Sequence, residues 1–304
     1  MMSTDTSANV IRDGVAPQQR ARPLSTTVAL GWLSVYLVAT AATLAMRGGH
    51  GWLVALHVGL VAACLAAIAS PARPLASFGD LAPLAIGPLL YMEIPQLIAV
   101  VGTGFHDAAV SGWEHSLFGT QPSRVLAGVL PYGWLSELLH AGYLSYYLVI
   151  FVPPLILYAR RERRGFAQTV LALTVVYTIC WSIYVLFPVE GPRYLWPAPA
   201  NVPDGFFRRV AVSLLAAGSS RGAAFPSSHM AVSVVQAGMA LYWQPRVGVV
   251  LAVLSALIGV GAVYGGFHYG IDMVCGALLG AGIVGAVLST CLRTRPSSVA
   301  ASGV

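Results

Sequence analysis

Lysine is missing from this sequence, and charged residues of every kind are scarce. Charged residues make up 9% of the 304 positions, hydrophobic residues make up 57%, and mean hydropathy is +0.74. A soluble domain typically carries about 25% charged residues. The net charge of +6 does not indicate nucleic-acid binding either, because the arginines lie between long apolar runs. The composition therefore predicts an integral membrane protein.

Cysteine is also scarce, and its spacing excludes two common kinds of site. The four cysteines lie inside or at the edges of apolar runs, with no CxxC or CxxH spacing: Cys64, Cys180, Cys275 and Cys291. A disulfide framework and a zinc site are therefore not expected. We interpret these residues as small buried hydrophobic side chains.

Apolar runs close to the roughly 20 residues that a bilayer requires recur along the chain. They predict an all-α integral membrane protein with about eight transmembrane helices, at about 24–46, 51–70, 81–103, 134–158, 166–187, 229–243, 247–266 and 271–291. Pro153 and Pro154 predict a kink in the fourth of these spans. Residues 104–132 mix aromatic and charged side chains and are too polar to span, so they predict an amphipathic segment at the membrane interface.

The distribution of arginine predicts the orientation in the membrane. With the N-terminus in the cytoplasm, eleven arginines fall on the cytoplasmic side and six on the opposite side, as the positive-inside rule favours. The dense cluster at 160–164 is then a topology anchor. This topology places the long loop 188–228 and the segment 266–272 together on the extracytoplasmic side.

Two short polar segments in apolar surroundings form the candidate site. The first runs from Arg221 to His229 and includes Ser227 and Ser228, and the second runs from His268 to Asp272. Polar groups at the ends of membrane helices are costly and are functional by default. Pro226 and the small residues before His229 predict a loop that leads into a helix, whose first N–H groups suit a phosphate.

These residue types match the needs of phosphoryl transfer, which requires a nucleophile, an acid for the leaving oxygen and positive charge on the phosphate oxygens. His268 is the candidate nucleophile, with Asp272 orienting its ring, and His229 is the candidate general acid. The substrate-binding candidates are Arg193, Arg221, Ser227 and Ser228. A metal site built from His229, His268 and Asp272 is the alternative. Histidine chemistry needs no metal, so we expect no cofactor.

The same residues resemble the type 2 phosphatidic acid phosphatase superfamily, and specifically its inositol phosphorylceramide synthase-like branch. Residues 224–231 (Ala-Phe-Pro-Ser-Ser-His-Met-Ala) resemble that branch's Phe-Pro-Ser-x-His motif, and 268–272 resemble its His-Tyr-x-x-Asp motif. Gly191-Pro-Arg193 resembles the upstream arginine motif, and 80–83 with Tyr91 and 113–119 match more loosely. The resemblance implies a phosphohistidine on His268, Asp272 as its partner, His229 as acid and Arg193 as phosphate clamp.

Some features depart from the broader superfamily. The lysine of its first motif is absent, Ser228 replaces the usual glycine before the histidine, and Ala262 stands where an arginine precedes the nucleophile by six residues. These departures fit the synthase-like branch and leave Arg221 as a substitute for the missing charge.

The resemblance covers roughly residues 78–290 and implies a six-helix core preceded by two further helices. We expect a disordered cytoplasmic tail at 1–23, two N-terminal transmembrane helices at 24–77, a phosphatase or phosphotransferase domain at 78–291 and a polar tail at 292–304.

The other polar residues have simpler interpretations. Glu93 and Glu190 are expected to be packed structural acids, with a proton path as the alternative. The glycine pairs 261/265 and 276/280 indicate close helix packing. The histidines outside the motifs are expected to be solvated interfacial residues: His50, His57, His106, His115 and His140.

The functional prediction is a membrane-embedded, metal-independent lipid phosphatase or phosphotransferase. Its substrate is a phospholipid or sphingolipid, it binds no nucleic acid, and it lies in a bacterial inner membrane with its site on the extracytoplasmic face. Water as acceptor gives hydrolysis and a lipid hydroxyl gives transfer, as in inositol phosphorylceramide synthesis. The alternative is a lipid transporter or lipid-binding membrane protein, but internal repeats, which many transporters carry, are not evident.

Overall fold

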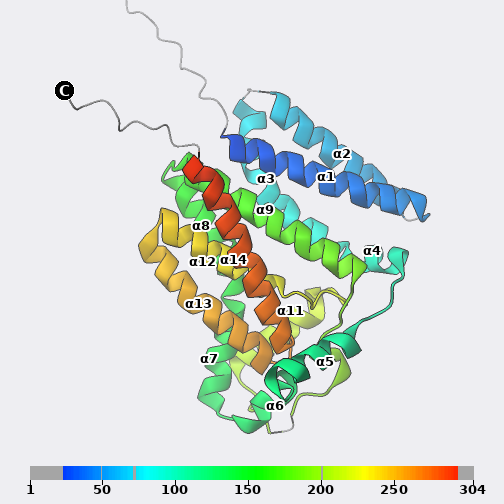
Figure 1. Ribbon diagram of the computed structural model, residues 1–304, viewed down its shortest axis with the longest axis vertical. Helices are drawn as coiled ribbons and strands as arrows, with labels where there is room; N and C mark the ends of the chain where they lie inside the picture. The colour runs from blue at the N-terminus through cyan, green and yellow to red at the C-terminus, as the bar shows by residue number, and fades with distance from the viewer. Residues whose placement is uncertain (1–22, 49, 71–72, 200, 294–304) are drawn as a thin grey trace, which may run out of the picture.

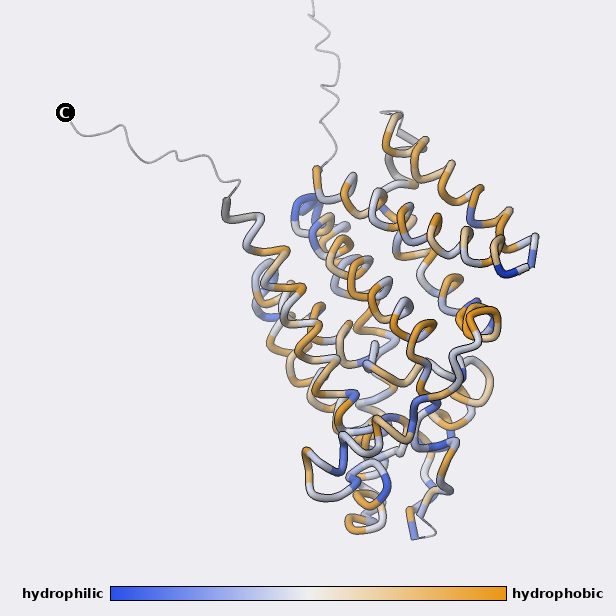
Figure 2. Tube along the Cα trace, turned by 45° about the vertical axis from the view of Figure 1, so that its right-hand side comes forward, coloured by the Kyte–Doolittle hydropathy of each residue, from blue (hydrophilic) through white to orange (hydrophobic). Residues whose placement is uncertain are grey.

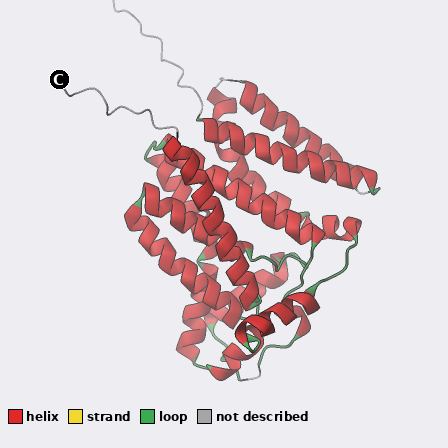
Figure 3. Ribbon diagram, in the orientation of Figure 1, coloured by secondary structure: helices red, strands yellow, loops and turns green. Residues whose placement is uncertain are grey.

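The computed structural model describes residues 23–48, 50–70, 73–199 and 201–293. Within these ranges the regular structure is helical (Figure 3), apart from one isolated bridge between Val189 and Ala223. The predicted all-α class is therefore confirmed. The tails predicted at 1–23 and 292–304 fall almost entirely outside the described residues.

The helices follow one another in this order: α1 (Leu24–Met46), α2 (Gly51–Ala69), α3 (Arg73–Met92), α4 (Ile94–Val101), α5 (Asp107–Phe118), α6 (Pro122–Val129), α7 (Gly133–Leu144), α8 (Tyr146–Ala159), α9 (Arg163–Leu186), α10 (Pro192–Leu195), α11 (Phe206–Gly218), α12 (Ser228–Trp243), α13 (Pro245–Tyr264) and α14 (Gly270–Arg293).

Among the described residues, five helices are long and apolar enough to cross a membrane: α1, α2, α9, α13 and α14. The number rises to seven if the bent pairs α3–α4 and α7–α8 each form one span. The predicted count of eight is not confirmed, because α12 has only 16 residues. It instead lies in the middle of the molecule, packed against α8, α9, α13 and α14. Hydrophobic residues follow the long helices, whereas hydrophilic ones gather at their ends (Figure 2).

Both bends lie between consecutive helices. The α3–α4 pair bends by 51° at Glu93, and the α7–α8 pair bends by 42° at Ser145. The bend of this span lies at Ser145, eight residues before Pro153; both prolines lie inside α8, where a kink stays a prediction. At the actual break the Ser145 hydroxyl donates to the Gly142 carbonyl at 2.6 Å, a local bond of the kind that bends helices.

The two N-terminal helices form a pair that lies beside α3, α4 and α9 (Figure 1). Polar contacts tie them there: His57 Nε2 lies 2.9 Å from Glu93 Oε2, and the Trp32 indole donates to Thr178 Oγ1 at 2.7 Å. His57 is fully buried, and His140 in α7 is 1% exposed. The interpretation of these two histidines as solvated was therefore wrong, because each has a protein partner in the interior.

The short helices α5, α6 and α11 gather at one end of the molecule, where α13 ends and α14 begins (Figure 1). Residues 188–228, expected to be a loop, contain α10 and the 13-residue α11. The α11 helix begins where Glu137 of α7 accepts hydrogen bonds from the backbone N–H groups of Phe207 and Arg208, at 3.1 and 3.3 Å. A carboxylate at a helix N-terminus complements the helix dipole.

The segment predicted to be amphipathic forms α5 and α6, with its polar and apolar faces reversed from an ordinary surface helix. In α5 the carboxylates of Asp107 and Glu114 are buried, whereas Trp113, Leu117 and Phe118 are exposed. Exposed aromatic and aliphatic side chains suit a helix at a membrane interface, which stays a prediction. The buried carboxylates face the candidate site.

Candidate active site

His268 lies in the turn between α13 and α14, where two acceptors hold one nitrogen of its ring. Its Nδ1 atom lies 3.0 Å from the Ala224 carbonyl oxygen and 3.3 Å from Asp272 Oδ2. A carbonyl oxygen only accepts, so Nδ1 carries a proton, and in the neutral ring the lone pair is therefore on Nε2. The expected contact between His268 and Asp272 is present, although α14 begins only at Gly270. The Asp272 carboxylate also accepts from the Tyr269 N–H at 2.8 Å and so caps this helix.

His229 lies in the first turn of α12 and faces His268. The two rings meet edge to face with centroids 5.5 Å apart. The Tyr143 hydroxyl lies 3.2 Å from His229 Nε2, and the ring of Tyr146 packs at 4.2 Å. Nδ1 of His229 is buried and has no hydrogen-bond partner among the described residues. His229 and His268 are therefore neighbours whose rings make different hydrogen bonds: His268 is held through Nδ1, whereas His229 is contacted at Nε2.

Two glycines of α14 bring these helices into backbone contact. A Cβ atom on Gly276 would lie 2.5 Å from the Ser227 carbonyl oxygen, and one on Gly280 would lie 2.5 Å from that of Ala231. No real side chain fits at these distances. The Gly276 and Gly280 pair thus serves close packing, as expected. The contact places α12, which carries His229, against α14, which carries Asp272 and follows directly after His268.

The two predicted phosphate-binding arginines lie around Tyr194. The guanidinium carbons of Arg193 and Arg221 lie 4.4 and 5.6 Å from the centre of its ring. Arg193 donates to the Tyr194 and Ser219 hydroxyls and has no carboxylate partner in the described part of the chain. Arg221 is 61% exposed and forms an ion pair with Glu190. The positive charge of Arg221 is therefore already balanced, whereas that of Arg193 is not.

Ser227 and Ser228 shape the entry to α12. The Ser227 side chain accepts from the Met230 N–H at 3.3 Å and caps the helix, and its own N–H donates to the Asp272 carbonyl at 3.1 Å. The Ser228 N–H donates to the Tyr184 hydroxyl at 3.0 Å, and that hydroxyl donates to the Pro226 carbonyl at 2.9 Å. Both backbone N–H groups expected to face phosphate therefore already have protein acceptors.

Sequence reasoning assigned no role to Asp107, yet its carboxylate joins the two motif segments. Oδ2 accepts from the Glu190 N–H and Oδ1 from the Gly191 N–H, each at 2.9 Å, and Oδ1 also accepts from the Tyr269 hydroxyl at 3.0 Å. Burial and the neighbouring Asp107 raise the pKa of Tyr269, so the phenol keeps the proton that it donates. Asp107 thus links the segment before Arg193 to the residue after His268.

Glu114 lies about two turns after Asp107 on the same buried side of α5 and has a similar structural role. It accepts from the Gly270 N–H at 2.7 Å and from the Ser123 hydroxyl at 2.8 Å. It therefore fixes the start of α14 and connects it to α6. The available signal for both carboxylates was their position in segment 104–132, which is too polar to span a membrane.

This arrangement can act on phosphorus. It combines a histidine ring held through Nδ1, a carboxylate behind the same ring, a second histidine and a guanidinium group with an unbalanced charge. These group types match the nucleophile, the orienting group, the proton donor and the charge that phosphoryl transfer requires.

Comparison with known proteins agrees with this chemistry. Residues 108–286, more than half of the chain, match the family model described as the PAP2 superfamily. A phosphoinositol dihydroceramide synthase from Bacteroides thetaiotaomicron is 29% identical over 275 residues, which cover 82% of this chain and 87% of the relative. No solved structure matches the chain. The matched range contains both histidine motifs. Of the site residues described above, Asp107 lies outside it, one position before its start.

These findings favour an enzyme over the alternative of a transporter or lipid-binding protein. The protein is a membrane-embedded lipid phosphatase or phosphotransferase, and the chain belongs to the PAP2 superfamily.

Proposed function

We propose that this protein transfers a phospho-head group from a phospholipid donor to the hydroxyl group of a lipid acceptor, through a covalent intermediate on His268. The pairing of His268 Nδ1 with the Ala224 carbonyl and Asp272 carries this proposal, because it leaves Nε2 unprotonated for attack. The name of the relative, a phosphoinositol dihydroceramide synthase, supports transfer over hydrolysis.

The reaction consists of two displacements at the same phosphorus atom. His268 Nε2 first attacks the donor phosphorus, the bond from phosphorus to the diacylglycerol oxygen breaks, and His229 donates a proton to that oxygen. The acceptor hydroxyl then attacks phosphorus, His229 takes the proton of that hydroxyl, and the bond from phosphorus to nitrogen breaks. Asp272 stabilises the charged His268 ring, as a carboxylate behind a catalytic histidine does.

Arg193 is the proposed clamp for the phosphate oxygens, because a guanidinium fork matches their geometry. Arg221 would contribute a second positive charge only after its ion pair with Glu190 opens. Ser227 and Ser228 act through the loop that they hold. None of these steps uses a metal ion, so we propose that turnover is metal independent.

We further propose that the protein lies in a bacterial inner membrane with the site on the extracytoplasmic face. The excess of arginine on the opposite side supports this orientation. Residues 24–77 would form an accessory helix pair, and residues 78–291 the catalytic domain.

The deciding experiment uses purified protein in detergent with EDTA present. One reaction contains a labelled phosphatidylinositol and a ceramide, and a second contains labelled phosphatidic acid alone. We expect a new phospholipid that requires both donor and acceptor, and we expect an acid-labile label on the protein when the acceptor is omitted. His268→Ala is the control and should abolish both.

Three outcomes would change the proposal. Free phosphate without a new lipid would indicate a phosphatase that uses the same site. Loss of activity with EDTA, restored by a divalent cation, would contradict metal independence. Full activity of His268→Ala would remove the covalent mechanism.

A further inference from the structure

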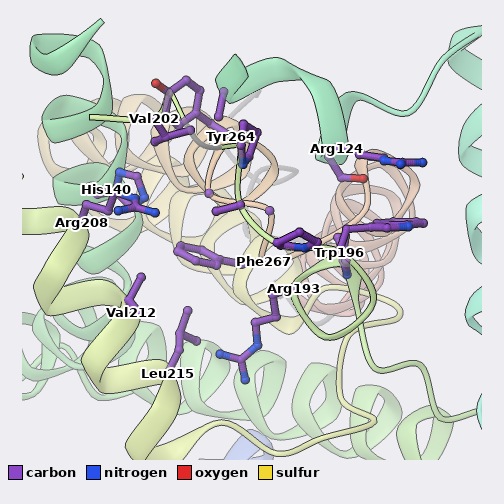
Figure 4. A pocket seen from close by; sticks show the side chains of 18 of the residues that line it. Arg124, His140, Arg193, Trp196, Val202, Arg208, Val212, Leu215, Tyr264 and Phe267 are labelled. Atoms are coloured by element: carbon purple, nitrogen blue, oxygen red, sulfur yellow. The ribbon is translucent and has the colours of Figure 1, made fainter. Parts of the chain in front are cut away.

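A cavity lies directly beside the nucleophile segment, and the chemistry above leaves most of it unused. Its volume is about 460 Å³, within the range of small-molecule sites. Residues 265–267, which lead into His268, form part of its wall, and Arg193 forms another part. Figure 4 shows Phe267 between two groups of side chains, with Arg208 and His140 on one side and Arg124 and Trp196 on the other.

The cavity is strongly basic. Arg124, Arg193 and Arg208 line it, and no Asp or Glu is among the described residues that do so. The guanidinium carbon of Arg124 lies 5.2 Å from the centre of the Trp196 ring. Arg208 has only a loose pairing, with Nη1 lying 3.5 Å from Oδ1 of the exposed Asp204. One phosphodiester carries one negative charge, which Arg193 alone can match, so two further arginines remain.

Three of the other polar side chains on the cavity wall already have a protein partner. The Tyr264 hydroxyl donates to the Leu130 carbonyl at 2.9 Å, the Ser123 hydroxyl donates to Glu114, and His140 Nδ1 lies 2.6 Å from the Ser136 carbonyl. What remains toward a ligand is mainly guanidinium N–H, which only donates. The cavity therefore suits a ligand rich in acceptor oxygens and larger than a phosphate group.

We propose that this cavity, the head-group pocket, holds the polar alcohol attached to the donor phosphate, with Arg124 and Arg208 binding its oxygens. The inference rests on the proposed function, because it assumes that the phosphate lies between Arg193 and His268. It adds the class of donor: one whose head group is a hydroxyl-rich or phosphorylated alcohol. A donor such as phosphatidic acid, which has no such alcohol, would leave the pocket empty.

The kinetic test compares two donors in four proteins. For wild type, Arg124→Ala, Arg208→Ala and Arg209→Ala, kcat/KM is measured with phosphatidylinositol and with phosphatidic acid. Arg209 is the matched control, since it neighbours Arg208 on α11 and does not line the cavity. We expect the ratio of the two kcat/KM values to fall about tenfold or more in each pocket variant, as for the loss of a hydrogen bond from a charged group, and to stay at the wild-type value in Arg209→Ala.

A binding test separates the pocket from catalysis. Thermal unfolding of His268→Ala, alone and combined with each arginine variant, is followed with inorganic phosphate, myo-inositol and myo-inositol 1-phosphate. We expect inositol phosphate to raise Tm more than phosphate does, by mass action, and this excess to disappear with Arg124→Ala or Arg208→Ala. If free myo-inositol also raises Tm, the pocket binds the hydroxyl groups themselves. If only myo-inositol 1-phosphate raises Tm, the pocket requires the phosphate group as well.

The two proposals fail in different ways. An equal Tm shift from phosphate and inositol phosphate, or the same loss in Arg209→Ala as in the pocket variants, would overturn the head-group pocket whatever the enzyme does. Full activity of His268→Ala would overturn the covalent mechanism while the binding data still decide the pocket.

Discussion

At the scale of single residues, the tautomer of His268 decides what the site can do. The Ala224 carbonyl and the Asp272 carboxylate both accept at Nδ1, so the lone pair is on the other nitrogen. This is a stronger statement than the motif alone supports, because spacing in the sequence does not show which nitrogen is bonded. It leads directly to the first prediction.

His268→Ala should abolish turnover, and Asp272→Asn should lower kcat by roughly 10²- to 10⁴-fold, as when an amide replaces the carboxylate of a catalytic triad. The amide keeps the shape of the carboxylate but does not stabilise a charged ring. Steady-state rates with EDTA present measure both effects, and the unfolding temperature in detergent checks that both variants fold. Asp272→Asn at the wild-type rate would show that His268 needs no carboxylate.

The sequence marked the candidate catalytic residues more clearly than the side chains that contact them. His229, His268 and Asp272 belong to short motifs, and the structure brings all three together. Tyr143 contacts His229 across 86 positions, and Asp107 contacts Tyr269 across 162. Neither Tyr143 nor Asp107 stands in a pattern that marks it, because helix packing alone sets these contacts.

At the scale of secondary-structure elements, α5 is the part that joins the two halves of the site. Asp107→Asn should disturb the spacing between Arg193 and His268, because an amide cannot accept from both backbone N–H groups as the carboxylate does. We expect KM for the lipid donor to rise and kcat to fall, together about tenfold or more in kcat/KM, with a stability loss of about 1–3 kcal/mol.

Tyr269→Phe is the matched comparison for Asp107→Asn, since it removes only the hydroxyl that reaches Asp107. If Asp107 positions both segments, the double variant should lose less activity than the two single losses combined, because the residues share one bond. Fully additive losses would show that Asp107 acts independently of the His268 segment.

The contact between α12 and α14 supports a prediction with an internal control. Gly276→Ala should destabilise the protein by about 1–3 kcal/mol and impair turnover, because the added carbon meets the Ser227 carbonyl and forces α12 away. Gly282 lies on the same helix with no atom within 4 Å of an added carbon. Gly282→Ala should therefore be neutral or stabilising. Tm and kcat of the two variants test this, and equal behaviour would contradict the packing role.

At the scale of the whole molecule, apolar runs predicted the positions of the helices well, but they predicted the positions of the bends poorly. The bend at Glu93 falls just before Pro95 in the first turn of α4, and the bend at Ser145 coincides with the hydroxyl bond to Gly142; mean hydropathy registers neither feature. The short α12 looked like a span because it is apolar, yet it is apolar because other helices surround it. Burial by protein and burial by lipid give the same sequence pattern.

The length of α9 connects the site to the membrane orientation. Its 24 residues run from Arg163 to Leu186, a distance of about 36 Å at 1.5 Å per residue. That exceeds the roughly 30 Å of a bilayer's hydrocarbon core. The basic cluster at 160–164 lies at one end and the site segment at 188–191 follows the other, so we expect the two to lie on opposite sides of the membrane.

Single cysteines at the two ends therefore test the orientation. In intact cells, a membrane-impermeant maleimide should label Ser213→Cys, on the exposed face of α11, and should not label Arg160→Cys. After the cells are lysed, both should react. Wild type supplies the background, since its described cysteines, Cys64, Cys180 and Cys275, are buried or partly buried. Labelling of Arg160→Cys but not Ser213→Cys in intact cells would place the site in the cytoplasm and would contradict the orientation that the arginine distribution predicts.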